Sequence, residues 1–244
     1  MSSQPNLSGH RVLVPGGTGT VGEGVVRQYL AAGAEVVVPT RTPERAAQFR
    51  AVLGPDATSH LHLVVHDYTT FAGAEDLAAQ TESRLGGIDD VVAPIGGFWG
   101  GRRLWEIDEA DWQGAFVELA TTHLAVLRAC LPRLDPDGAY LVVVGGSAFT
   151  PVPGSGLVSM EQAAVAMMQQ VAAAELGGRP RVFSLVLGPV RTRDEGDAGR
   201  DQVTADQIGA VAVAASAARV DGQQIQLGSQ SEAARALARL AVAA

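Results

Sequence analysis

The sequence contains one cysteine, Cys130, among 244 residues, so it cannot form an internal disulfide. A lone thiol fits a reducing compartment. The segment before His10 is short and polar, without the apolar core of a signal peptide. Together these features predict a cytoplasmic protein. Cys130 lies in an apolar helical pattern, and we expect it to be inert packing.

Positive charge and long apolar runs are also scarce. The chain has 18 lysine and arginine residues against 26 aspartate and glutamate residues, for a formal net charge of −8. A nucleic-acid partner would need a basic face, so we expect none. No uninterrupted apolar run reaches the roughly 18 residues of a membrane span, so we expect no membrane partner.

Apolar residues make up 47% of the chain, and they occur in short strand-like runs that alternate with helical patterns. This alternation predicts an α/β fold, a doubly wound parallel sheet covered by helices on both faces. No linker or composition shift divides the chain, so residues 1–244 are predicted to form a single domain. Its core would span about 7–228, followed by a helix at about 229–243 with a capping box at Ser229 and Glu232. Strands are expected at 11–14, 35–39, 61–66, 88–93, 139–144, 182–187 and 224–227, and the longest helices at 108–131 and 159–176.

The stretch from Val12 to Gly22 carries the clearest functional signal. A β-branched strand leads into a turn with Gly16, Gly19 and Gly22 at intervals of three, and a helical pattern follows. Strand, glycine turn and helix in this order are the context of a dinucleotide-binding loop. Small residues let the backbone approach a pyrophosphate, and the start of the helix favours its negative charge.

The end of the second strand indicates which dinucleotide is bound. Sites that prefer NAD place an acidic residue there to bond the ribose hydroxyl. This chain has Thr40 and Arg41 instead. A guanidinium pairs with a 2′-phosphate, so the sequence predicts NADP(H) as the cofactor.

With these landmarks the chain resembles the short-chain dehydrogenase/reductase family, from about Leu7 to Gly228. Asp67 follows the third strand, Trp112 and Pro132 bracket the fourth helix, and the segments 188–192 and 221–228 resemble the family's later motifs. The resemblance implies a Rossmann fold, a nicotinamide cofactor, an oxidoreductase activity and a homodimer or homotetramer formed through the two long helices. The glycine loop and the resemblance together imply cofactor contacts at Gly16, Thr18, Gly19, Thr20, Val21, Gly22, Arg41, Asp67, Tyr68, Ala93, Gly96, Gly188 and Thr192.

The catalytic motif departs from the family pattern. Val158 and Gln162 stand where the family has its tyrosine and lysine, and Leu119 replaces its asparagine. Ser147 alone is kept, and it is the expected catalytic residue. Valine cannot donate a proton, and glutamine carries no charge that would shift the pKa of a neighbour. Polar residues that could substitute as the acid are Ser159, Ser147 and His123, whereas Tyr140 is expected to point away.

Three function classes therefore stay open. The first is an NADP-dependent oxidoreductase with a non-standard catalytic centre. The second is a non-catalytic cofactor-binding sensor or scaffold subunit, and the third is an isomerisation or cyclisation in the same pocket. The substrate would be a small molecule, flat or apolar if Phe98, Trp99 and Trp105 wall its pocket rather than cover the sheet edge.

Two further segments lead to expectations about the site. His60, His62 and His66 share one face of a strand, but a metal site needs ligands from several elements, so no metal is expected. The charged segment 193–203 is short for a substrate loop, and it predicts an open crevice beneath a loosely held lid.

Overall fold

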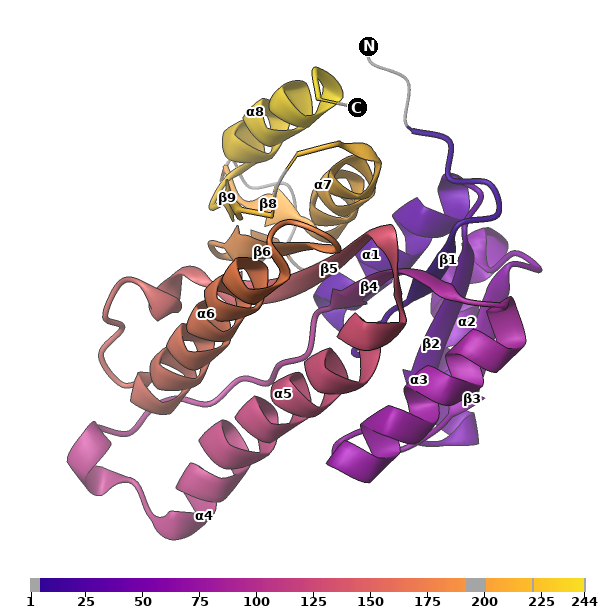
Figure 1. Ribbon diagram of the computed structural model, residues 1–244. Helices are drawn as coiled ribbons and strands as arrows, with labels where there is room; N and C mark the ends of the chain where they lie inside the picture. The colour runs from indigo at the N-terminus through magenta and orange to yellow at the C-terminus, as the bar shows by residue number, and fades with distance from the viewer. Residues whose placement is uncertain (1–4, 192–200, 221, 244) are drawn as a thin grey trace.

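A computed structural model describes residues 5–191, 201–220 and 222–243. Within them, one fully parallel sheet has the strand order β3-β2-β1-β4-β5-β6-β9, which confirms the doubly wound fold (Figure 1). A small parallel pair, β7 with β8, was not predicted. The strands are β1 (Arg11–Leu13), β2 (Glu35–Thr40), β3 (Leu61–Val65), β4 (Ile88–Ala93), β5 (Leu134–Gly145), β6 (Arg181–Leu187), β7 (Val190–Arg191), β8 (Val203–Thr204) and β9 (Gln224–Leu227).

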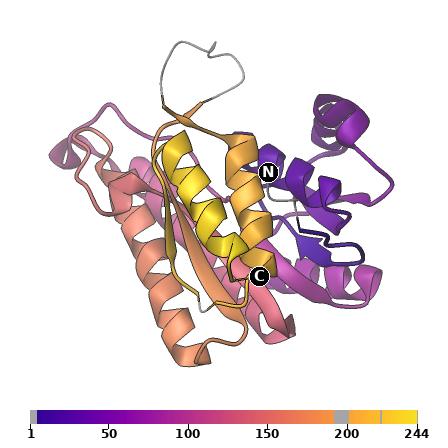
Figure 2. The same ribbon diagram turned by 90° about the horizontal axis from the view of Figure 1, so that it is seen from above.

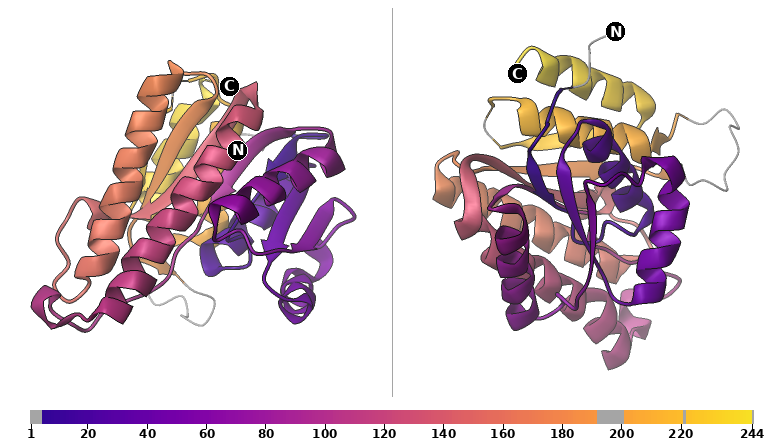
Figure 3. Two further views of the ribbon diagram at one scale, coloured as in Figure 1. Left: turned by 60° about the horizontal axis from the view of Figure 1, so that its bottom comes forward. Right: turned by 90° about the vertical axis from the view of Figure 1, so that its right-hand side faces the viewer.

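Helices cover both faces of the sheet. On one face α3, α5 and α6 lie side by side, and on the other α1, α7 and α8 pack together (Figures 2 and 3). The pleat explains the two layers, because successive residues of a strand face opposite sides. Val12 belongs to one core cluster and Leu13 to the other. The helices are α1 (Thr20–Ala31), α2 (Pro43–Leu53), α3 (Phe71–Leu85), α4 (Glu109–Trp112), α5 (Glu118–Cys130), α6 (Gly156–Leu176), α7 (Ala205–Ala217) and α8 (Gln230–Ala241).

Most helix starts follow the local sequence. Thr42 accepts a hydrogen bond from the Arg45 amide at 3.2 Å ahead of Pro43, so α2 begins where its cap and proline predict. Asp108 likewise caps α4, and a π-helical turn at Gln113–Val117 joins α4 to α5. The predicted helix 108–131 is therefore nearly continuous.

Two local predictions were wrong. Strand β5 begins at Leu134 rather than near residue 139. Leu134 pairs with Ile88 before an irregularity in the strand register, and the turn-forming residues that follow Leu134 hide this pairing in the sequence. The expected capping box of the last helix is only half formed. Ser229 accepts the Glu232 amide at 3.2 Å, but the Glu232 carboxylate accepts the Gly228 amide at 2.6 Å instead of closing on Ser229.

One helical segment, Glu109–Arg133, is long and apolar enough to cross a membrane by length and composition. Its mean hydropathy is high, although polar residues interrupt each of its apolar runs. Within the fold, α5 lies between α3 and α6, and 44% of the most apolar 18-residue stretch of this segment is buried. Its apolar character therefore has a packing role in this sheet layer.

Helices α1 and α7 approach one another through glycine. A Cβ atom on Gly24 would lie 2.2 Å from the carbonyl carbon and oxygen of Ala205, and one on Gly209 would lie 2.4 Å from the Gly24 oxygen. These neighbours are backbone atoms, so no side-chain rotation could relieve the overlap. The layer that carries α1, and with it the glycine loop, depends on this contact.

We predict that Gly24→Ala lowers the free energy of unfolding by roughly 1–3 kcal/mol, the usual range for overpacking, because α1 and α7 must separate. The matched control is Gly114→Ala, where a Cβ atom meets nothing within 4 Å. Better helix propensity should leave that variant as stable or up to about 1 kcal/mol more stable. Urea denaturation of both variants checks the difference, and equal stabilities would contradict the packing argument.

Candidate functional site

The order of strands reverses between β1 and β4, and a cleft of about 300 Å³ opens at their carboxyl ends. Open α/β sheets bind ligands at this position. We call it the cofactor cleft. Its lining residues are Gly16, Thr18, Gly19, Pro39, Thr40, Arg41, Arg45, Asp67, Tyr68, Thr69, Pro94, Ile95, Gly96, Leu119 and Thr122.

The glycine loop forms one wall of the cofactor cleft by direct backbone contact. Gly16 has a φ of +83°, and a Cβ atom there would lie 2.5 Å from the Pro94 carbonyl oxygen. A Cβ atom on Gly22 would lie 2.4 Å from the Gly16 oxygen. Both positions therefore require glycine, which explains the spacing seen in the sequence.

The start of α1 is suited to an anion. Gly19 occupies the N-cap position and supplies no side-chain cap, whereas α2, α3, α7 and α8 are each capped by a threonine or serine. Thr20 and Val21 are the first residues of α1, and their amides belong to the unpaired first turn. The exposed N–H groups and the helix dipole can hold a phosphate here.

Basic side chains lie at the other end of the cofactor cleft. Arg41 is exposed, and it has no hydrogen bond or ion pair within the described part of the chain. Arg45 reaches from α2 to the glycine loop, where its Nη2 donates to the Thr18 carbonyl at 3.2 Å. Arg45 was missed in the sequence. The signal was present, because it stands four residues after Arg41 in the first turn of a well-capped helix.

Asp67 and Tyr68 complete this end of the cleft. Backbone and side-chain hydrogen bonds from Thr69 lower the pKa of Asp67, with the nearby Arg41 charge adding to the effect. Asp67 is thus an anion with one oxygen engaged by Thr69. Burial raises the pKa of Tyr68, which stays a neutral phenol beside Gly16.

The remaining predicted cofactor residues are placed unevenly. Gly96 lines the cofactor cleft, whereas Ala93 is fully buried as the last residue of β4. Gly188 follows β6 and packs against Gly228, outside the lining of the cleft. Thr192 and the lid segment up to residue 200 lie outside the described residues. Val203, at the end of that segment, is fully buried and pairs with Val190.

A second cavity, of about 580 Å³, lies beyond the end of β5, and we call it the apolar pocket. Ser147 and Ser159 are among its few polar lining residues, and Trp105, Phe149 and Met160 are among the apolar ones. Ser159 donates its hydroxyl to the Ser155 carbonyl at 3.0 Å. The Ser147 hydroxyl has no hydrogen-bond partner in the described part of the chain, so it is available to a ligand.

Phe98, Trp99 and Trp105, the aromatic residues of the loop after β4, have different roles. Trp105 lines the apolar pocket, which agrees with the expectation that these residues wall a substrate pocket. Trp99 donates its indole N–H to Asp111 at 3.0 Å and ties the loop to α4. Phe98 is 95% exposed and does neither.

The resemblance assigns the family's tyrosine and lysine positions to Val158 and Gln162 of α6, and its asparagine position to Leu119 of α5. Val158 is partly buried, and Leu119 lines the cofactor cleft. Both polar atoms of the Gln162 amide are bonded: its Oε1 accepts the Gly145 amide at 2.6 Å, and its Nε2 donates to Glu161 at 2.6 Å. Gln162 therefore connects α6 to the end of β5.

The other candidate acids are buried. His123 has no exposed surface, and burial lowers its pKa to about 4, with a weaker opposing effect from its hydrogen bond to the Ile95 carbonyl. Tyr140 is fully buried, and its hydroxyl has no hydrogen-bond partner in the described part of the chain. It lines neither the cofactor cleft nor the apolar pocket, in line with the expectation that it points away from the site. Burial raises the pKa of Cys130 to about 12, which confirms it as inert packing.

The histidines of the third strand serve as partners of carboxylates. His60 and His62 share Glu35, at 2.5 and 2.7 Å, and His66 bonds Asp76 at 2.8 Å. Their rings are therefore directed to two separate carboxylates.

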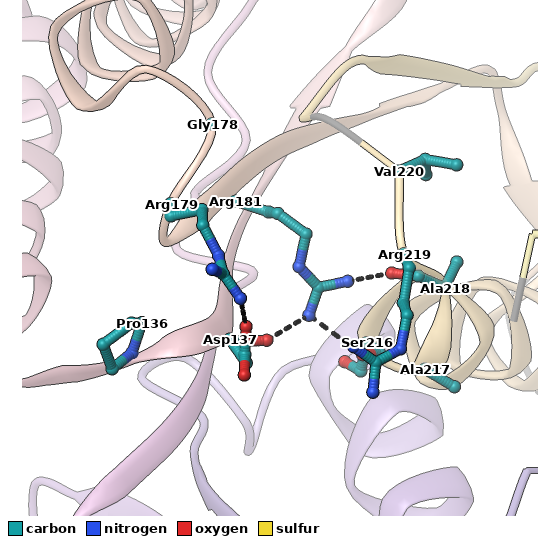
Figure 4. A pocket seen from close by; sticks show the side chains of 10 residues that line it. All are labelled: Pro136, Asp137, Gly178, Arg179, Arg181, Ser216, Ala217, Ala218, Arg219 and Val220. Atoms are coloured by element: carbon teal, nitrogen blue, oxygen red, sulfur yellow. Dashed lines mark hydrogen bonds and ion pairs between the residues drawn. The ribbon is translucent and has the colours of Figure 1, made fainter.

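A further cavity of about 250 Å³ lies at the opposite end of β6 (Figure 4). Arg181 lines it and donates to the carbonyls of Asp137, Ala215, Ser216 and Ala218. Arg179 is paired with the Asp137 carboxylate. These bonds tie β6 to the end of α7, which is a structural role remote from the cofactor cleft.

With this geometry in view, the chain matches the family model described as enoyl-(acyl carrier protein) reductase over residues 17–239. The chain belongs to the short-chain dehydrogenase/reductase family. Family membership confirms the resemblance seen in the sequence and places the chain among oxidoreductases.

Relatives within the family are distant. The chain is 26% identical over 192 residues to the cis-2,3-dihydrobiphenyl-2,3-diol dehydrogenase of Paraburkholderia xenovorans (strain LB400), across 76% of this chain and 68% of that protein. It is 29% identical over 150 residues to the hydroxysteroid 11-beta-dehydrogenase 1-like protein of Xenopus tropicalis, across 60% of this chain and 51% of that protein. The match therefore spans about half the length of the second relative.

Solved structures of family members share the fold. A short-chain dehydrogenase from Burkholderia cenocepacia J2315 in complex with NADP superimposes with a TM-score of 0.79, at 20% identity over 91% of this chain and 98% of that one. The short-chain dehydrogenase/reductase from Serratia marcescens BCRC 10948 gives a TM-score of 0.78, at 19% identity and the same two coverages. At these identities the likeness shows the fold alone.

Proposed function

We propose that this chain is an NADP(H)-binding oxidoreductase with a non-standard catalytic centre. The observation that carries the proposal is the pairing of an uncapped helix N-terminus with two arginines in one cleft. The α1 amides suit the pyrophosphate, and Arg41 and Arg45 suit a 2′-phosphate. The Burkholderia relative in complex with NADP supports the same cofactor.

The apolar pocket supports a flat or apolar small molecule as the substrate. NADPH, when bound, supplies a hydride to a carbonyl carbon. Ser147 would donate its hydroxyl hydrogen bond to that carbonyl and polarise it. A proton must still reach the product oxygen, and neither Val158 nor the engaged Gln162 amide supplies one. The expected result is slow reduction.

A cofactor-binding sensor or scaffold subunit is the second candidate. The bonded state of Gln162 favours it, because both polar atoms of that side chain are committed to the protein. Such a protein would bind NADP(H) as tightly as an enzyme and turn over no carbonyl substrate.

Self-association is also part of the proposal. Several large apolar side chains of α5 and α6 are exposed, namely Leu124, Met160, Met167 and Val171 at 42–57%. Pairing of these helices across a two-fold axis would bury them in a homodimer or homotetramer. Cytoplasmic localisation stays a prediction.

We predict that the wild-type protein binds NADPH more tightly than NADH, and that Arg41→Ala weakens NADPH binding roughly ten- to a hundredfold while sparing NADH. A charge-assisted bond to a phosphate has about this value. Arg50→Ala, on the exposed side of α2, is the control and should change neither affinity. Calorimetric titration of the three proteins with each cofactor measures all six affinities, and equal binding of NADH and NADPH by the wild type would refute the cofactor assignment.

We predict that conventional carbonyl reduction is absent or very slow, and that Val158→Tyr with Gln162→Lys raises it by about 10²–10⁴, the value of a positioned general acid. NADPH oxidation with a panel of ketones and quinones checks this. Gln162→Lys alone is the control, since it adds the cation without the acid. If the wild type already reduces ketones at ordinary family rates, another residue is the acid.

We predict that Met167→Glu shifts the protein from a dimer or tetramer to a monomer, because it places a charge in the shared apolar face. Ala79→Glu, exposed on α3 away from that face, should leave assembly unchanged. Light scattering at micromolar concentration distinguishes the two, and a monomeric wild type would dispose of the self-association proposal.

A further inference from the structure

Helix α6 carries a buried carboxyl group that the proposed reaction does not use. The Glu161 side chain is fully buried beside His123, which is equally buried on α5. Glu161 accepts one hydrogen bond, from Gln162, and its Oε1 has no partner in the described part of the chain. Buried polar atoms are nearly always paired, so this one calls for an explanation.

One nitrogen of His123 lies between two oxygen atoms. Its Nε2 is 3.0 Å from the Ile95 carbonyl and 3.7 Å from Glu161 Oε1. A carbonyl can only accept, so Nε2 carries the hydrogen and donates it to Ile95. One N–H shared between two oxygens bonds each of them more weakly, so the two oxygens compete for it. Whichever oxygen attracts it more strongly determines whether the Ile95 carbonyl is held.

The Ile95 carbonyl belongs to a wall of the cofactor cleft. Pro94, Ile95 and Gly96 all line the cleft, and a Cβ atom on Gly16 would lie 2.5 Å from the Pro94 oxygen and 3.2 Å from the Ile95 nitrogen. The segment is thus in van der Waals contact with the glycine loop. A change at Ile95 acts directly on the loop that would hold the pyrophosphate.

We propose that Glu161 is a positioning residue, which sets the affinity of the cofactor cleft for NADP by competing with the Ile95 carbonyl for the His123 N–H. This inference rests on the proposed function. When Glu161 is a neutral acid, the His123 N–H stays bonded to the Ile95 carbonyl, as in the structure, and the segment 94–96 is held in place. When Glu161 is a carboxylate, it attracts the His123 N–H more strongly, because hydrogen bonds to charged groups are stronger. The Ile95 carbonyl then loses this bond, and the segment 94–96 is free to shift.

The surroundings of Glu161 place its ionisation near neutral pH. Burial raises the pKa of Glu161 to about 7, opposed by the hydrogen bond from Gln162. His123, the titratable group that faces it from α5, stays neutral. The Gln113–Val117 turn and the 3-10 turn Gly146–Ala148 have no ionisable side chain.

The charged groups of the adjacent strands lie far from Glu161. Asp135 and Asp137 are exposed at the start of β5, at the end of the strand opposite Gly145. On β5, Tyr140 stays a phenol because burial raises its pKa well above the ordinary value. On β6, Arg181 stands at the opposite end of the strand, paired with Ala139 rather than with Gly145. Protonation of Glu161 is therefore favoured below about pH 7, and the fixed wall is lost as the pH rises through that value.

The test is calorimetric titration of the full chain with NADP⁺ between pH 5.5 and 8.5, comparing wild type with Glu161→Gln. The wild-type Kd should rise three- to tenfold from pH 6 to pH 8, about the effect of one hydrogen bond. The variant keeps a neutral amide at this site and should lack that rise. Titration of the ligand's own phosphate is common to both proteins, so the difference between the two profiles isolates Glu161.

An infrared difference spectrum supplies a second readout. A protonated-carboxyl band should disappear with a midpoint near pH 7 in the wild type and be missing from Glu161→Gln. If that variant does not fold, His123→Leu removes the shared donor and should also flatten the Kd profile. Parallel Kd profiles in wild type and variant would overturn this inference alone, whereas failure to bind NADP⁺ at every pH would overturn the proposed function.

Discussion

The backbone contact between Gly16 and Pro94 is the constraint on which the site depends. It joins the loop after β1 to the segment after β4, on the two sides of the point where the strand order reverses. A single methyl group at Gly16 would collide with the Pro94 oxygen. The contact fixes the start of α1 relative to both strands, and it therefore decides where the unpaired amides of that helix point.

Two independent features of the fold converge on this contact. From one layer, α7 presses on α1 through Gly24, which sets the depth of the helix against the sheet. From the other layer, α5 reaches the Ile95 carbonyl through His123. One helical layer thus contacts the helix that follows the glycine loop, and the other contacts the segment after β4, on the two sides of the Gly16–Pro94 contact. Such an arrangement makes the cleft sensitive to changes in either layer, even at residues far from any ligand.

The sequence was sufficient for features that depend on local rules. Alternating strands and helices, the Thr42 and Asp108 caps and the requirement for Gly16 and Gly22 all follow from periodicity, capping and backbone sterics. Side-chain partners across elements could not be predicted in this way. The meeting of Glu161 with His123 joins two helices, and the choice of Glu232 between Gly228 and Ser229 depends on the exact path of the chain. Arg45 could have been identified, because it lies in the first turn of the helix that Thr42 caps, directly after the strand end at Thr40 and Arg41.

The departures at Glu161 and Gln162 explain one another. An amide can accept the Gly145 N–H with its oxygen and donate to Glu161 with its nitrogen. Lysine has no acceptor, so the resemblance-based residue at position 162 would leave the Gly145 amide unpaired. It would instead place a cation against Glu161 and hold that group ionised. A buried acid that becomes neutral only below about pH 7 therefore requires a neutral partner with both hydrogen-bonding functions, and glutamine meets both conditions. The glutamine at position 162 and the buried acid at position 161 are therefore linked through one hydrogen bond.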